Sequence, residues 1–225
     1  MQTADLARNG IVKKLETYER LFYGFSYVGD IVPPNYKHLP HAITIGQPLS
    51  PAIIDAIAAG PNDAYYAEYL SVNDRLDLIT GQLEAEIEKL GYFAHAVLSS
   101  QRTDFVNIAG EFPHKSAAVR AGLGWIGKSS LFITREYGPR IRLSTVLTDI
   151  PLSSGRLLSK NYCGKCRKCT DSCPANAISG NSWRSGLPRE ALLDVKRCDF
   201  WKINKYPEFH GQVCGICVAV CPHGK

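Results

Sequence analysis

The first 162 residues of this 225-residue chain contain no cysteine, whereas the last part contains eight, between Cys163 and Cys221. This abrupt change in composition predicts two domains, an α/β domain over residues 1–155 and a small cysteine-rich domain over residues 156–225. The boundary falls in a stretch, residues 151–162, that is rich in Ser, Gly and Pro. Such residues favour a break between regular elements.

The sequence also lacks long apolar runs. No stretch approaches the roughly 18 uninterrupted apolar residues of a membrane-spanning helix. Charges are scattered through the N-terminal residues, where a secretory signal would have an apolar core. We therefore expect a cytoplasmic protein with no membrane partner.

Periodicity predicts mixed α/β structure in the N-terminal part. The clearest helix spans residues 63–90, where apolar residues recur at intervals of three and four and Gly91 follows as a cap. Further helices are predicted over residues 4–22 and 114–121. Strands are predicted over residues 42–46, 92–98, 131–134 and 141–148, the last two separated by the turn EYGPR.

The cysteines follow the spacing of bacterial ferredoxins. The first four form the pattern C-x2-C-x2-C-x3-C-P, in which three thiolates bind one [4Fe–4S] cluster and the fourth binds the other. A second group also ends in Cys-Pro. We therefore predict a ferredoxin-like domain with two [4Fe–4S] clusters. One cluster would be held by Cys163, Cys166, Cys169 and Cys221, and the other by Cys173, Cys198, Cys214 and Cys217.

Two alternatives for the cysteines are disfavoured. Structural zinc takes four ligands, usually as two separated pairs, whereas four cysteines here crowd into eleven residues. Disulfides belong to exported proteins, and nothing in the sequence signals export.

The net charge of +5 gives little support for a nucleic-acid partner, because eight thiolates and two cluster cores reduce it to about +1. Basic residues surround the cysteines. They either steer an acidic electron donor, such as a ferredoxin or flavodoxin, or offset the charge of the clusters. These residues are Lys165, Arg167, Lys168, Lys196, Arg197, Lys202 and Lys205.

The segment HKSAAVRAGLGWIGKSSLFITREYGPRIRLSTVLTDIPL, residues 114–152, resembles a block of epoxyqueuosine reductases and corrinoid reductive dehalogenases. Those enzymes follow it with the same cysteine arrangement, including an isolated cysteine like Cys198. The resemblance implies a nitroreductase-like α/β fold, with a mixed sheet and flanking helices. It also implies a cobalamin bound beside one cluster.

The motif AGLGWIGK carries the predicted cobalamin contacts. Glycines let the backbone approach a flat macrocycle closely, Trp125 offers a planar wall, and Lys128 offers a cation for a phosphate. The alternative is a tight turn with Trp125 in the domain core. The residues assigned to cobalamin are Gly122, Leu123, Gly124, Trp125, Gly127 and Lys128.

The chain departs from the epoxyqueuosine reductases at their acidic residue, which is thought to protonate substrate. The matching position is Ile108, and Asp104 and Glu111 are out of register. Candidates for catalysis are His114, Tyr137 and Arg140, with the alternatives that the histidine is structural and the other two hold a turn. The chain is also short, so we expect part of the surface around a corrin, or for tRNA, to be absent.

These observations favour an iron–sulfur oxidoreductase that passes electrons through two clusters to a cobalamin, which reduces a small-molecule substrate. The alternative is a non-catalytic electron-transfer protein that delivers low-potential electrons to a partner such as a corrinoid protein. Reduction of epoxyqueuosine in tRNA is a weaker version of the first hypothesis, because the acid and the helical-repeat domain are missing. An RNA-binding protein with structural clusters is a third possibility, which would require tight, salt-dependent tRNA binding.

Overall fold

The computed structural model describes residues 2–155 and 161–225, which form two compact units. Of the described residues, the first unit comprises 2–48, 71–123 and 142–155. The second comprises 49–70, 124–141 and 161–225. It therefore joins the cysteine-rich segment to two pieces of the N-terminal part. The domain boundary predicted at residues 155 and 156 lies at the edge of a segment outside the described residues, and it stays a prediction.

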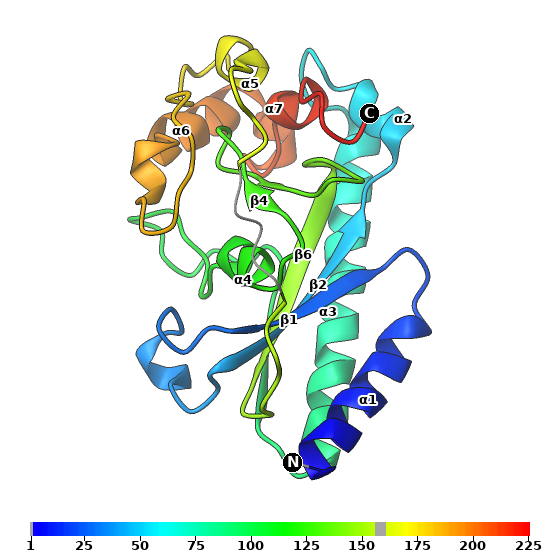
Figure 1. Ribbon diagram of the computed structural model, residues 1–225. Coiled ribbons are helices and arrows are strands. Elements are labelled where there is room, and N and C mark those ends of the chain that lie inside the picture. Colours follow the sequence, from blue (N-terminus) through cyan, green and yellow to red (C-terminus); the bar gives the residue numbers. More distant parts are fainter. Residues whose placement is uncertain (1, 156–160) are drawn as a thin grey trace. The chain divides into compact units, whose positions relative to one another are not determined.

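The first unit is built on a four-stranded sheet with the order β1-β2-β6-β3 (Figure 1). β1 (Phe22–Tyr27) pairs antiparallel with β2 (His41–Pro48), and β3 (Ala94–Val97) pairs antiparallel with β6 (Ile141–Thr148). The strands predicted around residues 42–46, 92–98 and 141–148 are confirmed. The α/β class is also confirmed, whereas the narrower nitroreductase-like assignment stays a prediction.

Three helices accompany this sheet. The predicted helix 63–90 is confirmed as α3 (Asp63–Lys89), and Gly91 follows it with a φ of +83°. The predicted helix 114–121 is α4 (His114–Arg120). α1 (Gln2–Glu16) ends earlier than predicted, because Arg20 takes a left-handed φ and the aromatic-rich segment after it forms β1 instead.

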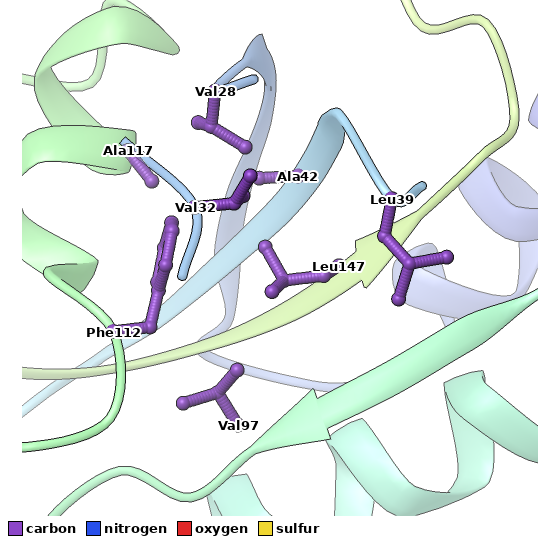
Figure 2. Packing of buried hydrophobic residues seen from close by; sticks show 8 residues of the cluster. All are labelled: Val28, Val32, Leu39, Ala42, Val97, Phe112, Ala117 and Leu147. Atoms are coloured by element: carbon purple, nitrogen blue, oxygen red, sulfur yellow. The ribbon is translucent and has the colours of Figure 1, made fainter. Parts of the chain in front are cut away.

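The two faces of the sheet contact different helices. On β6, Ser144 donates from its hydroxyl to Thr80 of α3, with an oxygen–oxygen distance of 3.4 Å. Leu147, an odd number of residues away, points to the opposite face. Figure 2 shows it there in a cluster with Ala117 of α4. The other members of this cluster are Val28, Val32, Leu39, Ala42, Val97 and Phe112.

The second unit consists of short elements. Its only sheet among the described residues is a hairpin of β4 (Trp125–Ile126) and β5 (Phe132–Ile133), so the strand predicted over 131–134 is present but shorter. α7 packs against α2 and α5. The helices of this unit are α2 (Pro51–Asp55), α5 (Lys168–Asp171), α6 (Val195–Lys205) and α7 (Ile216–Ala219), with 3-10 turns at Arg189–Ala191 and Pro207–Phe209.

Within the described residues, no helix has both the length and the apolar character needed to cross a membrane.

The first unit also contains a 3-10 turn, η1 (Pro34–Tyr36).

Leu83 and Leu78 of α3 provide a test of the first unit's core. Leu83 is fully buried, whereas Leu78 is 63% exposed. We expect Leu83→Ala to lower the free energy of unfolding by about 2–5 kcal/mol, because it leaves a cavity. Leu78→Ala should change it by less than about 0.5 kcal/mol. Urea unfolding followed by circular dichroism measures both, and equal effects would contradict the burial of this helix face.

Candidate metal centre

Four cysteines of the second unit line one small cavity. They are the set that the spacing assigns to one cluster: Cys163, Cys166, Cys169 and Cys221. The remaining lining residues come from the β4–β5 hairpin and from the residues that follow the last cysteine. These are Lys128, Ser129, Ile133, Pro222 and His223.

The hairpin forms an apolar wall of this cavity. Trp125 and Ile133 are buried against Cys221 and pack against Cys163. Two glycines permit this close packing. A Cβ on Gly124 would lie 2.1 Å from the carbonyl oxygen of Ile133, and a Cβ on Gly127 would lie 2.4 Å from the Ile133 side chain. The Gly127 Cβ would also lie 3.4 Å from the Cys163 sulfur. These glycines therefore bring the hairpin strands and the cysteine loop together.

Two polar side chains join the hairpin to the cysteine loop. The Nζ of Lys128 donates to the carbonyl oxygen of Cys166 at 3.1 Å. Asn161 accepts from the backbone N–H of Cys163 at 2.9 Å and donates to the carbonyl oxygen of Ile126 at 3.0 Å. The cysteine loop is thus held in place before it binds metal.

The other four cysteines also lie near one another. Burial raises the pKa of the Cys217 thiol, and neighbouring Cys214, Cys198 and Cys173 raise it further. Burial raises the pKa of Cys221 to about 11, and its thiol neighbours are Cys163, Cys169 and Cys166. The first-named thiol neighbours of Cys217 and Cys221 thus belong to the set that the spacing predicts for each, and Cys217 is also influenced by Cys169 of the other set. Since metal binding needs thiolates, loading these sites must release protons.

The donor set fits two [4Fe–4S] clusters. Among the described residues, no three Cys, His, Asp or Glu side chains converge on a single metal ion. A cubane does not require such convergence, because each thiolate binds a different iron. The indole N–H of Trp125 is buried beside the first set of cysteines, and no described residue accepts a hydrogen bond from it. A cluster sulfur is an acceptor of the kind that such a donor needs.

Comparison with known proteins agrees with this arrangement. Residues 162–224 match a family model described as a 4Fe-4S double cluster binding domain. The chain is 34% identical over 183 residues to an epoxyqueuosine reductase of Vibrio cholerae, covering 73% of this chain and 44% of that protein. It is 30% identical over 192 residues to a tetrachloroethene reductive dehalogenase of Dehalobacter restrictus, covering 78% and 30%.

The chain belongs to the superfamily of epoxyqueuosine reductases and reductive dehalogenases. It carries the double-cluster domain of these iron–sulfur proteins, and it spans less than half the length of these two curated relatives.

Solved structures of the superfamily share its fold. The catabolic reductive dehalogenase NpRdhA superposes with a TM-score of 0.72 at 22% identity, over 91% of this chain and 30% of that one. An epoxyqueuosine reductase in complex with a modified tRNA stem loop superposes with a TM-score of 0.67 at 17% identity, over 98% and 66%.

The residues that the resemblance assigns to cobalamin divide between the two units. Gly122 and Leu123 belong to the first unit, where Gly122 has a φ of +76° and Leu123 would contact a Cβ on Gly24. The motif from Gly124 to Lys128 belongs to the second unit, where it walls the cysteine cavity. These residues thus have internal packing roles, and their contact with cobalamin stays a prediction.

His114 is held on both sides of its ring. Its Nε2 donates to the carbonyl oxygen of Leu98 at 3.1 Å, so its Nδ1 accepts from the Thr145 hydroxyl at 2.8 Å. Burial lowers the pKa of His114 to about 4. The imidazole is therefore neutral near pH 7 and supports the packing of α4 on β6. A catalytic role for it stays a prediction.

Tyr137 and Arg140 hold the EYGPR turn in the second unit. Arg140 is 2% exposed, donates from its backbone N–H to the carbonyl oxygen of Tyr137 at 3.1 Å, and donates from Nη2 to Asp55 at 2.7 Å. A Cβ on Gly138 would lie 1.9 Å from the carbonyl oxygen of His223, so this turn packs directly on the residues after the last cysteine. Their participation in catalysis stays a prediction.

Sequence reasoning missed two polar groupings. Asn161 precedes the first cysteine by two residues, and this spacing, which suits a side chain bonded to nearby backbone, was an available signal. In the first unit the Glu111 carboxylate accepts from the Tyr36 hydroxyl at 2.6 Å and lies 3.2 Å from Nε2 of His95. Nothing in the sequence pattern links these three residues.

Asp104, the other acid near the expected position of the proton donor, accepts hydrogen bonds from the backbone N–H groups of Val106 and Asn107 in its own loop.

Replacing Gly124 tests the hairpin. We expect Gly124→Ala to impair cluster retention and lower the thermal midpoint, because the added Cβ would collide with backbone in β5. Gly81→Ala in α3 is the matched control, since nothing lies within 4 Å of its added Cβ. That change should stabilise the helix by about 0.5–1 kcal/mol. Iron content and thermal unfolding measure both. Full iron and an unchanged midpoint in Gly124→Ala would refute the close approach.

The depressed pKa of His114 predicts a pH dependence of stability. The unfolded imidazole binds a proton below about 6.5, whereas the folded one binds it only near 4. Its stabilising contribution is therefore complete above pH 6.5 and is lost as the pH falls towards 4. Between pH 7 and 5 the loss should be roughly 2 kcal/mol. Urea unfolding of the protein and of His114→Gln measures it. The loss of stability between pH 7 and 5 should vanish in His114→Gln. It should persist in His38→Gln, which changes an exposed histidine.

Proposed function

We propose that this protein is an iron–sulfur reductase whose two clusters pass low-potential electrons to a bound cobalamin, which reduces a small substrate. The observation that carries the proposal is the extent of the sequence relationship. The double-cluster model matches residues 162–224 alone, whereas identity to the Vibrio cholerae reductase covers 73% of the chain. A simple electron carrier has no need to share an α/β unit with reductases.

The proposal that this protein binds cobalamin is based on its resemblance to other proteins. One solved reductive dehalogenase that resembles this chain is described as carrying out B12-dependent dehalogenation. When bound, cobalamin supplies a strongly reducing cobalt centre. Gly124, Gly127, Trp125 and Lys128 pack around the cysteine cavity, and their contact with a corrin is proposed from the resemblance alone.

The chain's own contribution is to gather and shield the clusters. The Cys169 thiol is among the groups that raise the pKa of Cys217, so the two cysteine sets are neighbours. Electrons can therefore pass between the two clusters. A small acidic ferredoxin or flavodoxin is the donor that the exposed basic residues around the cysteines, such as Lys165 and Arg167, would attract. Thiolate clusters of this kind suit a reducing compartment, which favours the cytoplasm.

The second candidate is a non-catalytic electron-transfer protein. It is favoured by the packing of Gly124 and Gly127 against Ile133, because this packing explains the glycine motif without a corrin. Such a protein would use the same clusters and deliver electrons to a partner such as a corrinoid protein.

Cofactor binding distinguishes the two functions. The protein is reconstituted anaerobically with iron and sulfide, mixed with hydroxocobalamin and desalted. We expect about eight irons per chain and retained corrin bands that respond to a low-potential reductant. Eight irons without corrin would refute the cobalamin reductase and leave the electron carrier.

Single cysteine variants control the iron count. Cys221→Ser and Cys198→Ser each remove one ligand from a different set, so each should reduce the iron content to about four. Loss of all iron from both variants would show that the clusters do not form independently. One or two metal ions in the unaltered protein, without broad visible absorption, would overturn the cluster assignment itself.

A further inference from the structure

Lys128 brings a buried cation to the first cysteine set. Its side chain lines the cavity with Cys163, Cys166, Cys169 and Cys221, and the residue is only 8% exposed. Its Nζ donates to the carbonyl oxygen of Cys166 at 3.1 Å. In the described part of the chain it forms no ion pair with a carboxylate. An ammonium group buried without a counter-ion is costly, so the site requires a negative charge near it.

A cluster held by four thiolates supplies that negative charge. Lys128 follows Gly127, whose added Cβ would lie 3.4 Å from the Cys163 sulfur, so the chain at this point passes close to the ligands. The apolar wall formed by Trp125 and Ile133 keeps water from screening the interaction. The electrostatic effect of Lys128 on the cluster is therefore stronger than that of an exposed lysine.

The second cysteine set has a different electrostatic environment. Lys202 is a cation that acts on two thiols of this set, Cys198 and Cys214. Its Nζ lies 3.3 Å from a carboxylate oxygen of Asp199, and both side chains are largely buried. This ion pair cancels much of the field that the lysine would otherwise exert on the second cluster.

We propose that Lys128 raises the reduction potential of the cluster held by Cys163, Cys166, Cys169 and Cys221 above that of the other cluster. Reduction by one electron adds a negative charge, which an adjacent buried cation stabilises. An electron from a low-potential donor that enters at the second cluster therefore moves preferentially to the first. The first cluster is the exit point of the relay. This inference rests on the clusters and not on cobalamin, so it stands or falls separately from the proposed reductase activity.

The test is an anaerobic redox titration of the reconstituted protein, with the paramagnetic reduced clusters followed by electron paramagnetic resonance. The key variant is Lys128→Gln, which keeps a donor for the Cys166 carbonyl and removes the charge. We expect the higher-potential step to move to lower potential, with at least a tenfold loss in the equilibrium constant for one-electron reduction, about 59 mV. The lower-potential step should move less.

Two further variants serve as controls. Lys165→Gln removes a charge from the same cysteine loop, but Lys165 is exposed to solvent. In this variant, the equilibrium constant for one-electron reduction of each cluster should therefore change by less than about twofold. Lys128→Arg keeps the charge and should keep both potentials. Lys128→Gln with full iron content and unchanged potentials would overturn the proposal, as would an equal shift in Lys165→Gln.

Iron content decides the case in which Lys128→Gln loses a cluster. Retention of both clusters and of the original potentials by Lys128→Arg would then support a role for the charge. Loss of clusters from Lys128→Arg as well would assign Lys128 to packing alone and refute the electrostatic role.

Discussion

The second unit depends on bringing negatively charged thiolates together in a place that excludes water. Burial alone opposes this, since it raises the pKa of Cys217 and Cys221 and favours neutral thiols. Hydrogen bonds to the backbone of the cysteine loop hold it in place before metal arrives. Lys128 bonds the loop at Cys166, and Asn161 bonds it at Cys163. Iron then replaces the protons, and metal binding stabilises the folded unit.

The glycine motif was predicted to contact cobalamin, which stays a prediction, and the structure shows a packing partner within the protein for two of its glycines. The sequence indicates that the backbone at Gly124 and Gly127 must approach something closely, and the structure agrees. A glycine pattern does not say what is approached. Here the partner is Ile133 in the next strand, only a few residues along the chain. Trp125 lies in the apolar wall of the cysteine cavity, which is the alternative that the sequence left open.

Local patterns predicted the elements whose cause is local. α3 follows from an apolar stripe of 3.6-residue period, and the four cysteines that spacing assigns to one cluster line one cavity. Contacts between distant segments were not predictable. A Cβ on Gly215 would collide with Ile57, and a Cβ on Gly138 would collide with backbone at His223. Neither contact leaves a periodic trace in the sequence, so the sequence analysis did not assign residues 49–70 and 124–141 to the cysteine-rich part.

A reductase and an electron carrier place the same demand on this unit. In both, an electron must move from the cluster that receives it to the cluster that gives it away, and two identical environments would provide no direction. Among the described residues, one buried lysine is bonded to a carbonyl oxygen and forms no ion pair, whereas another is paired with Asp199. This difference in pairing makes the two cluster sites electrostatically unequal. This difference in reduction potential between the two clusters does not depend on which acceptor finally receives the electron, because it requires only the clusters and the two lysines.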